Sequence, residues 1–223
     1  MTELTKGSIF MNARDPISAL THFIGFLMAL FYSPLLIVHA VRSGAGHGQL
    51  AAVSVFIVSL LLLYGSSTIF HYFEQESPAG MMRKRMDHLM IFVLIAGTYT
   101  PVCVCAMGAP GRILLIVVWS IAAVGMLFKF LWVTCPKWVS SVIYIGLGWA
   151  ILFALPSFAA CVSPFTLFWI AAGGVIYTIG GVIYALKLKS FNSRDSLWGS
   201  HEIFHLFVMA GSLCHFIGVF SIF

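Results

Sequence analysis

The chain has 223 residues, of which 61% are hydrophobic and only 9% are charged. Soluble domains carry about 25% charged residues, and so few charges cannot cover the surface of a water-soluble globule. The 12 Lys and Arg residues exceed the 7 Asp and Glu residues, but the longest basic run is Arg83-Lys84-Arg85. The composition therefore excludes soluble enzymes, disordered chains and disulfide-rich secreted scaffolds, and the small basic run argues against nucleic acid as a partner.

Seven apolar stretches are each long enough to cross about 30 Å of hydrocarbon as a helix. In chain order they predict spans at 16–41, 48–73, 86–107, 110–133, 139–158, 165–186 and 198–222. The longest connections, 74–85 and 187–197, are too short to hold a soluble domain. We therefore predict an all-α fold in which residues 1–223 form one seven-helix transmembrane domain. The first stretch is too long for the apolar region of a signal peptide, and no small-residue cleavage site follows it, so no cleavable signal is expected.

Basic residues predict how the chain is oriented, because Lys and Arg are enriched in cytoplasmic loops. If the N-terminus lies inside, Arg42 and Arg112 are the two basic residues on the outer side. Seven spans then place the C-terminus outside, and the protein belongs in a cell membrane, with a bacterial inner membrane favoured. The ten basic residues of the inner side are Lys6, Arg14, Arg83, Lys84, Arg85, Lys129, Lys137, Lys187, Lys189 and Arg194.

Ionisable residues inside membrane spans are costly and usually functional. His71 ends the second span, Asp87 begins the third, and His201 and His205 begin the seventh, so all four lie at the same predicted depth. The i, i+4 spacing of the last pair puts both imidazoles on one helix face. Three histidines with water in a fourth position form a catalytic zinc site. We predict that His71, His201 and His205 bind a metal and that Asp87 accepts a hydrogen bond from the water.

Two alternatives stay open for these residues. Each histidine near a helix end could instead snorkel or bond a carbonyl group. The segment His201-Glu202-Ile203-Phe204-His205 also matches the H-E-x-x-H motif of zinc proteases, which would make Glu202 a general base. No acidic residue follows Glu202 as the usual third ligand, so we interpret Glu202 as an interfacial or supporting residue. His22, in the inner half of the first span, could line a cavity. The five cysteines show no metal-ligand spacing, and packing is their expected role.

The combination of Ser67-x-x-x-His71, Asp87 and His201-x-x-x-His205 on the last of seven spans resembles the hemolysin III family. That family is related to the progestin and adipoQ receptors, which include the adiponectin receptors, and is similar to alkaline ceramidases. The resemblance implies a seven-helix bundle with its N-terminus inside and a zinc ion near the cytoplasmic face. It assigns zinc ligation to the three histidines, a water-contacting role to Asp87 and a supporting role to Ser67. Further matching segments are Arg85-Met86-Asp87-His88, Ala96-Gly97-Thr98-Tyr99-Thr100-Pro101 and Phe204-His205-Leu206-Phe207.

The resemblance implies two classes of function. One is a zinc-dependent hydrolase of amide or ester bonds in membrane lipids, with Asp87 and Ser67 as catalytic residues. The other is a receptor-like, non-enzymatic regulator of membrane lipid composition and fluidity in which zinc is structural. An open water position on the metal favours the enzyme, and a metal closed by protein ligands favours the regulator. A pore-forming hemolysin is disfavoured, because the spans show few polar stripes. Imidazole ligands also suit transition metals other than zinc.

Overall fold

The computed structural model describes residues 9–74, 76–186 and 198–223, and within these ranges the regular structure is entirely helical. Seven helical spans are long and apolar enough to cross a membrane, which confirms the predicted all-α fold. Their order and bounds are α1 (Pro16–Arg42), α2 (His47–Tyr72), α3 (Pro78–Pro101) with a π-helical turn (Val102–Ala106), α4 (Gly108–Leu131), α5 (Lys137–Gly148) with a 3-10 segment (Trp149–Ala154) and α6 (Leu155–Cys161), α7 (Pro164–Leu186) and α8 (Ser200–Phe220).

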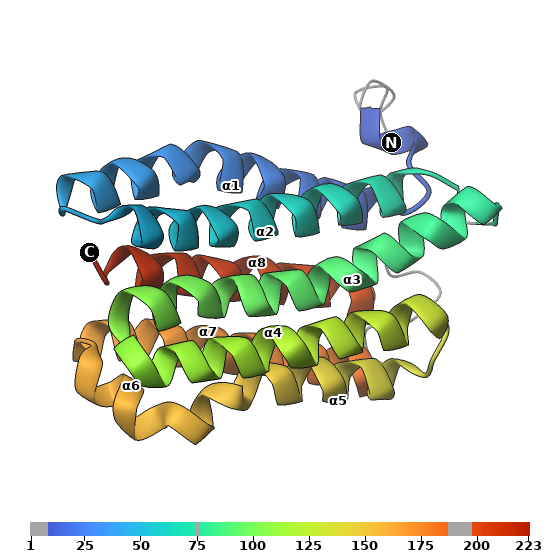
Figure 1. Cartoon of the computed structure of the whole chain (residues 1–223). Helices are drawn as coiled ribbons and strands as arrows, with labels where there is room; N and C mark the ends of the chain where they lie inside the picture. The colour runs from blue at the N-terminus through green and yellow to red at the C-terminus, as the bar shows by residue number, and fades with distance from the viewer. Residues whose placement is uncertain (1–8, 75, 187–197) are drawn as a thin grey trace.

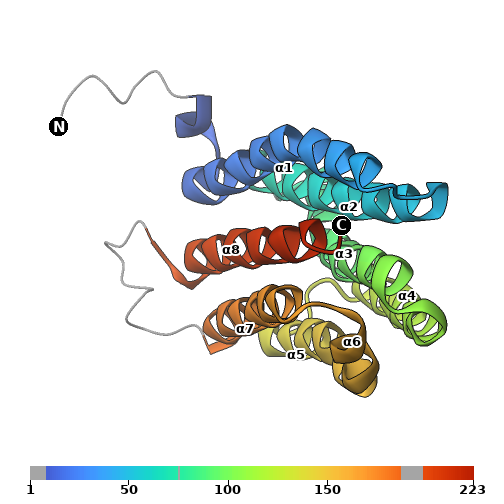
Figure 2. The same cartoon turned by 90° about the vertical axis from the view of Figure 1, so that its left-hand side faces the viewer.

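The spans lie side by side along the length of the bundle (Figure 1). Sequential helices are in contact and α8 returns to contact α1, so the spans close into a ring. Helix α8 packs on α7 on one side and on α1 on the other, so it lies between the α1–α2 pair and the α5–α7 pair (Figure 2). The start of α8 thereby comes close to the start of α1 and the end of α2. This closure brings residues that are far apart in the sequence to one end of the bundle.

The third span begins earlier than hydropathy predicts. The apolar stretch predicts a start at residue 86, whereas α3 begins at Pro78. The Ser77 hydroxyl accepts a hydrogen bond from the Gly80 backbone N–H at 3.0 Å, and Pro78 occupies the first helical turn, where its missing N–H needs no partner. Hydropathy marks only the part of a helix that lies in hydrocarbon. The basic run 83–85 is therefore helical rather than part of a loop.

The fifth span is broken, and a tyrosine from α3 bridges the break. Pro156 lacks a backbone N–H, so the regular hydrogen-bond ladder cannot continue through it. The Tyr99 hydroxyl donates to the Gly148 carbonyl at 2.7 Å and accepts from the Ile151 N–H at 2.8 Å. These bonds satisfy backbone groups that have no water to pair with inside a membrane. The predicted span 139–158 corresponds to helical residues 137–161.

Glycines allow α7 to approach α8 closely. A Cβ atom on Gly173 would lie 2.6 Å from the ring of His215, and one on Gly180 would lie 2.5 Å from Cβ of Phe207. Both distances are shorter than van der Waals contact, so a larger residue would push the helices apart. Small residues are the usual means of close helix packing in membranes.

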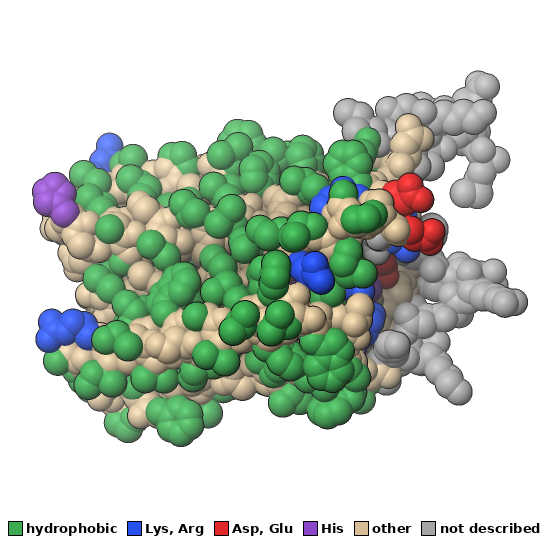
Figure 3. Space-filling model, turned by 45° about the vertical axis from the view of Figure 1, so that its right-hand side comes forward, with side chains coloured by type: hydrophobic (Ala, Val, Ile, Leu, Met, Phe, Trp, Pro, Cys, Tyr) green, Lys and Arg blue, Asp and Glu red, His purple; other side chains and the backbone are tan. Residues whose placement is uncertain are grey.

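Charged side chains gather at one end of the bundle (Figure 3). This end holds Arg14 before α1, Arg83–Arg85 in α3, Lys129 at the end of α4 and Lys137 at the start of α5. Arg42 and Arg112 lie at the opposite end. The other basic residues that the orientation used, Lys6, Lys187, Lys189 and Arg194, lie outside the described residues.

Topology reporters test the predicted orientation. Fusions within 134–138 and within 74–85 are expected to report a cytoplasmic location, and a fusion after Phe223 an external one, because positive loops are retained inside. A pair of reporters, one active only in the cytoplasm and one only outside it, makes the measurement. A C-terminal fusion active only in the cytoplasm would show that the orientation is inverted.

Candidate metal centre

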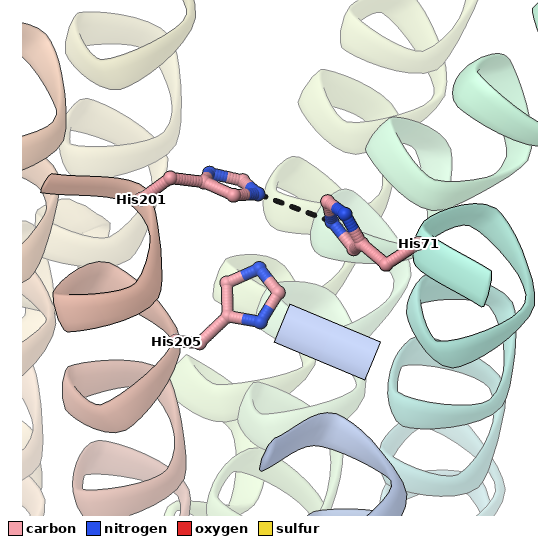
Figure 4. A group of neighbouring side chains, drawn as sticks. All are labelled: His71, His201 and His205. Carbon is pink, nitrogen blue, oxygen red and sulfur yellow. Dashed lines mark hydrogen bonds between the residues drawn. The ribbon is translucent and has the colours of Figure 1, made fainter. Parts of the chain in front are cut away.

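His71, His201 and His205 converge at the charged end of the bundle (Figure 4). His71 lies in the last turn of α2, whereas His201 and His205 lie one turn apart at the start of α8. One ring nitrogen from each residue lies within 4.8 Å of the other two. His71 and His205 are each 2% exposed, and His201 is partly buried. The three rings that the sequence predicts as ligands therefore form one group that could hold a metal ion.

The spacing of these nitrogens fits a small metal ion. Nε2 of His71 lies 3.1 Å from Nε2 of His201. Two nitrogens bound to one tetrahedral zinc ion at about 2.0–2.1 Å would lie roughly 3.3 Å apart. A change of a few tenths of an ångström would therefore open this pair for an ion. All three donors are imidazoles, which suit zinc and other late transition metals.

Asp15 holds the ring of His71 and was not found by sequence reasoning. Its Oδ2 lies 3.1 Å from Nδ1 of His71. An ionised carboxylate can only accept, so Nδ1 carries the proton and Nε2 is left free to bind a metal. The hydrogen bond from His71 is the largest influence on Asp15 and lowers the pKa of its carboxyl group, against the opposing effect of burial. Two backbone bonds fix the segment, from Asp15 N–H to the His71 carbonyl and from Arg14 N–H to the Tyr72 carbonyl.

Replacing Asp15 by Asn is expected to weaken zinc binding by about 10–100-fold, because partners of metal-ligating histidines contribute on that scale. The amide keeps the size of the side chain but removes the charge that holds the Nδ1–H tautomer. Titration of the purified apoprotein with zinc against a competing chelator measures the effect. An unchanged zinc affinity would show that Asp15 contributes only to the structure at the start of α1 and not to metal binding.

Residues of α1 also contact the ring of His205, which lies in α8. The Thr21 hydroxyl lies 3.5 Å from Nδ1 of His205, and the ring of His22 stacks on that of His205 with centroids 3.7 Å apart and an angle of 15°. The sequence places His22 on the inner half of the first span, and the structure places its ring against a candidate ligand. It is not one of the three residues whose ligand atoms converge.

Glu202 links α8 to α1. Its Oε1 accepts from the Ser18 hydroxyl at 3.0 Å, and its Oε2 accepts from the Gly199 backbone N–H at 2.9 Å. The second bond caps the start of α8, where a negative charge is also favoured by the helix dipole. Both carboxylate oxygens thus have structural partners. This geometry supports the interfacial interpretation of Glu202 over the general-base interpretation of the H-E-x-x-H motif.

Asp87 and Ser67 lie beside the three histidines but outside the converging group. Asp87 is 7% exposed and Ser67 is 1% exposed, and both line the same cavity. His88 contacts Asp87, with Nδ1 3.2 Å from Oδ2 of Asp87. Consecutive helix residues point in different directions, yet these two side chains are in contact.

A cavity of about 300 Å³ opens next to this group inside the ring of helices. His22, Ser67, Asp87, His201 and His205 provide polar walls at the charged end of the bundle. Most other walls are apolar, and the cavity reaches His215, which lies ten residues beyond His205 or about 15 Å along α8. An apolar, elongated cavity with a few converging polar groups is typical of sites for small apolar ligands.

The sequence is similar to that of a known protein family and of several known proteins. The model of the family described as haemolysin-III related matches residues 10–216. The chain is 34% identical to the hemolysin-3 homolog of Bacillus subtilis over 95% of each chain. It is 32% identical to hemolysin-3 of Bacillus cereus, over 98% of this chain and 96% of that protein. It is also 24% identical to the adiponectin receptor protein of Drosophila melanogaster, over 74% of this chain and 40% of the receptor.

Proposed function

Because the chain belongs to the haemolysin-III related family, an integral membrane family, we propose that it is a zinc-dependent hydrolase of amide or ester bonds in membrane lipids. One observation carries the proposal. Three histidines that could hold one ion converge beside a buried carboxylate that is not part of their group, at one end of an apolar cavity. Three protein ligands leave a position for water, as in catalytic rather than structural zinc sites.

Zinc bound by these histidines would supply an electrophile for the lipid carbonyl and lower the pKa of a coordinated water toward 7. Asp87 is the residue that takes the proton from water. Its carboxylate is buried at the cavity wall, where a proton acceptor is shielded from bulk water. A general base of this kind contributes about 10²–10⁴-fold to rate.

The remaining residues position the groups that take part in the reaction. His88 holds the Asp87 carboxylate through the contact of its Nδ1 with Oδ2, and Ser67 lines the same cavity, where it can position the water or the lipid carbonyl. Asp15 and Thr21 orient the rings of His71 and His205. The apolar walls hold the hydrocarbon part of a lipid and exclude water from it. The substrate is therefore a lipid whose scissile carbonyl lies near the charged end of the bundle.

A receptor-like regulator of membrane lipid composition is the second candidate. It is favoured by the similarity to a protein named an adiponectin receptor and by the way in which the histidines tie α2 to α8. In that case zinc would stabilise the bundle, and the cavity would bind a lipid without cleaving it. The proposed setting for either function is the inner membrane of a bacterium.

An assay of lipid hydrolysis distinguishes the two candidates. Purified, zinc-loaded protein in mixed micelles is incubated with a phospholipid and with an N-acylated amino-alcohol lipid, and released fatty acid is measured by mass spectrometry. The proposal predicts release by wild type and by the control His47→Ala, whose histidine is exposed far from the site. It predicts no release by His201→Ala/His205→Ala. Absence of release from both lipids by zinc-loaded wild type would favour the regulator.

A further inference from the structure

His22 is a deeply buried polar side chain without a hydrogen-bond partner. It lies in α1, and its residue surface is 3% exposed. Neither ring nitrogen has a partner of good geometry among the described residues. A neutral imidazole has one N–H donor and one acceptor nitrogen. Leaving both unpaired away from water reduces stability, so a buried group of this kind calls for an explanation.

Packing alone does not explain a histidine at this position. The ring stacks face to face on His205 and meets Tyr64 edge to face, with centroids 5.2 Å apart and an angle of 81°. Phenylalanine would make both contacts and would bury no polar atom. His39, on the same helix, also stacks on a ring, that of Phe220, with centroids 3.9 Å apart. His39 is only partly buried, and its nitrogens are not among the buried unpaired atoms.

The ring of His22 borders the cavity next to Ser67 and Asp87. Nδ1 of His88 already contacts the Asp87 carboxylate, whereas neither nitrogen of His22 has a hydrogen-bond partner among the described residues. Hydrogen bonds to a ligand often form only in the complex, even where the ligand-free geometry is not aligned. The hydrogen-bond partner of the His22 ring is therefore expected on a molecule in the cavity rather than on the protein.

We propose that His22 binds the carbonyl or carboxylate oxygen of a long-chain lipid in the cavity through its ring N–H, while its ring face holds His205 in place. The inference rests on the proposed function for the class of ligand. It assigns two separate tasks to one side chain, one to its nitrogens and one to its ring face. His22→Phe separates them, because phenylalanine keeps a flat ring and removes both nitrogens.

Binding of octadecanoic acid, a fatty acid of the kind that lipid hydrolysis would release, provides the test. The purified protein in detergent is titrated with the acid, and bound zinc is measured on the same samples. His22→Phe is expected to keep the zinc content of wild type and to raise the Kd for the acid about tenfold, the loss for one hydrogen bond to a buried group. His39→Phe, which replaces a stacked histidine on the same helix, is expected to leave both values unchanged.

A second measurement does not depend on how His22→Phe folds. In wild type labelled with ¹⁵N-histidine, the His22 ring signals, assigned by their absence in His22→Gln, are expected to shift when the acid binds. Unchanged His22 signals at saturation, an unchanged Kd in His22→Phe, or no saturable binding of the acid by wild type would each overturn the inference. Wild type that binds the acid through His22 but retains no zinc would instead contradict the proposed function and leave this inference standing.

Discussion

The variant His201→Ala/His205→Ala is expected to retain almost no zinc, whereas wild type is expected to hold about one ion per chain. Two of three ligands are lost, and the ring of His71 alone cannot hold the ion. The ion would join α2 to α8, which are more than a hundred residues apart in the sequence, so its binding free energy also stabilises the fold. Zinc at about 1,000 times its Kd contributes roughly 4 kcal/mol, which corresponds to a thermal midpoint about 10 °C higher.

Metal analysis of the purified protein and thermal unfolding in detergent measure both effects. His47→Ala is the matched control, since it removes an exposed histidine at the opposite end of α2 and should change neither value. Addition of a strong chelator to wild type should lower its thermal midpoint to that of the double variant. Equal zinc contents in wild type and the double variant would contradict the assignment of these histidines.

Asp87→Asn is expected to keep most of the zinc and to reduce lipid hydrolysis by at least about 100-fold, the lower end of the contribution of a general base. Asparagine preserves the size of the side chain, and its amide oxygen can still accept the hydrogen bond from His88. It cannot accept a proton from water. The carboxylate is not part of the group of converging ligand atoms, so zinc binding should survive. Zinc analysis and fatty acid release are measured on the same preparation.

Glu202→Gln is the control that separates this mechanism from that of a zinc protease. The amide oxygen can still accept from the Gly199 N–H and the amide NH2 can donate to the Ser18 hydroxyl, so the link between α1 and α8 is retained and activity should stay within a few-fold of wild type. If Glu202→Gln lost lipid hydrolysis and Asp87→Asn kept it, Glu202 would be the general base. Loss of zinc in Asp87→Asn as complete as in the histidine variants would make Asp87 a ligand. Full lipid hydrolysis by Asp87→Asn would show that Asp87 is not the general base.

Much of the fold follows from the sequence, because a bilayer demands long apolar helices whose backbone groups are paired within the segment. The seven predicted spans all occur, and most of their ends agree within a few residues. The start of α3 was predicted eight residues late, since the Ser77 cap extends the helix into polar sequence. The break before α6 depends on Tyr99 of another span, and no local pattern shows such a contact.

The three histidines of the candidate site were predictable for a different reason. The spacing of His201 and His205 is local, and the helix ends put His71 at the same depth, so topology alone brings them together. The interaction between Asp15 and His71 joins residues 56 apart, and it depends on how the segment before α1 turns onto the end of α2. The stack of His22 on His205 depends on the rotation of α1 about its axis. Hydropathy carries no information on either.

X-ray absorption at the zinc edge of the purified wild-type protein shows which atoms surround the bound ion. We expect about one zinc ion per chain, bound by three imidazoles at about 2.0–2.1 Å with one further light atom, and no sulfur neighbour. Substitution of His71 by Ala should remove one imidazole from the shell or the ion altogether. A protein purified without any bound transition metal, and unable to take one up, would contradict a metal site made by His71, His201 and His205, as would a zinc shell that contains cysteine sulfur.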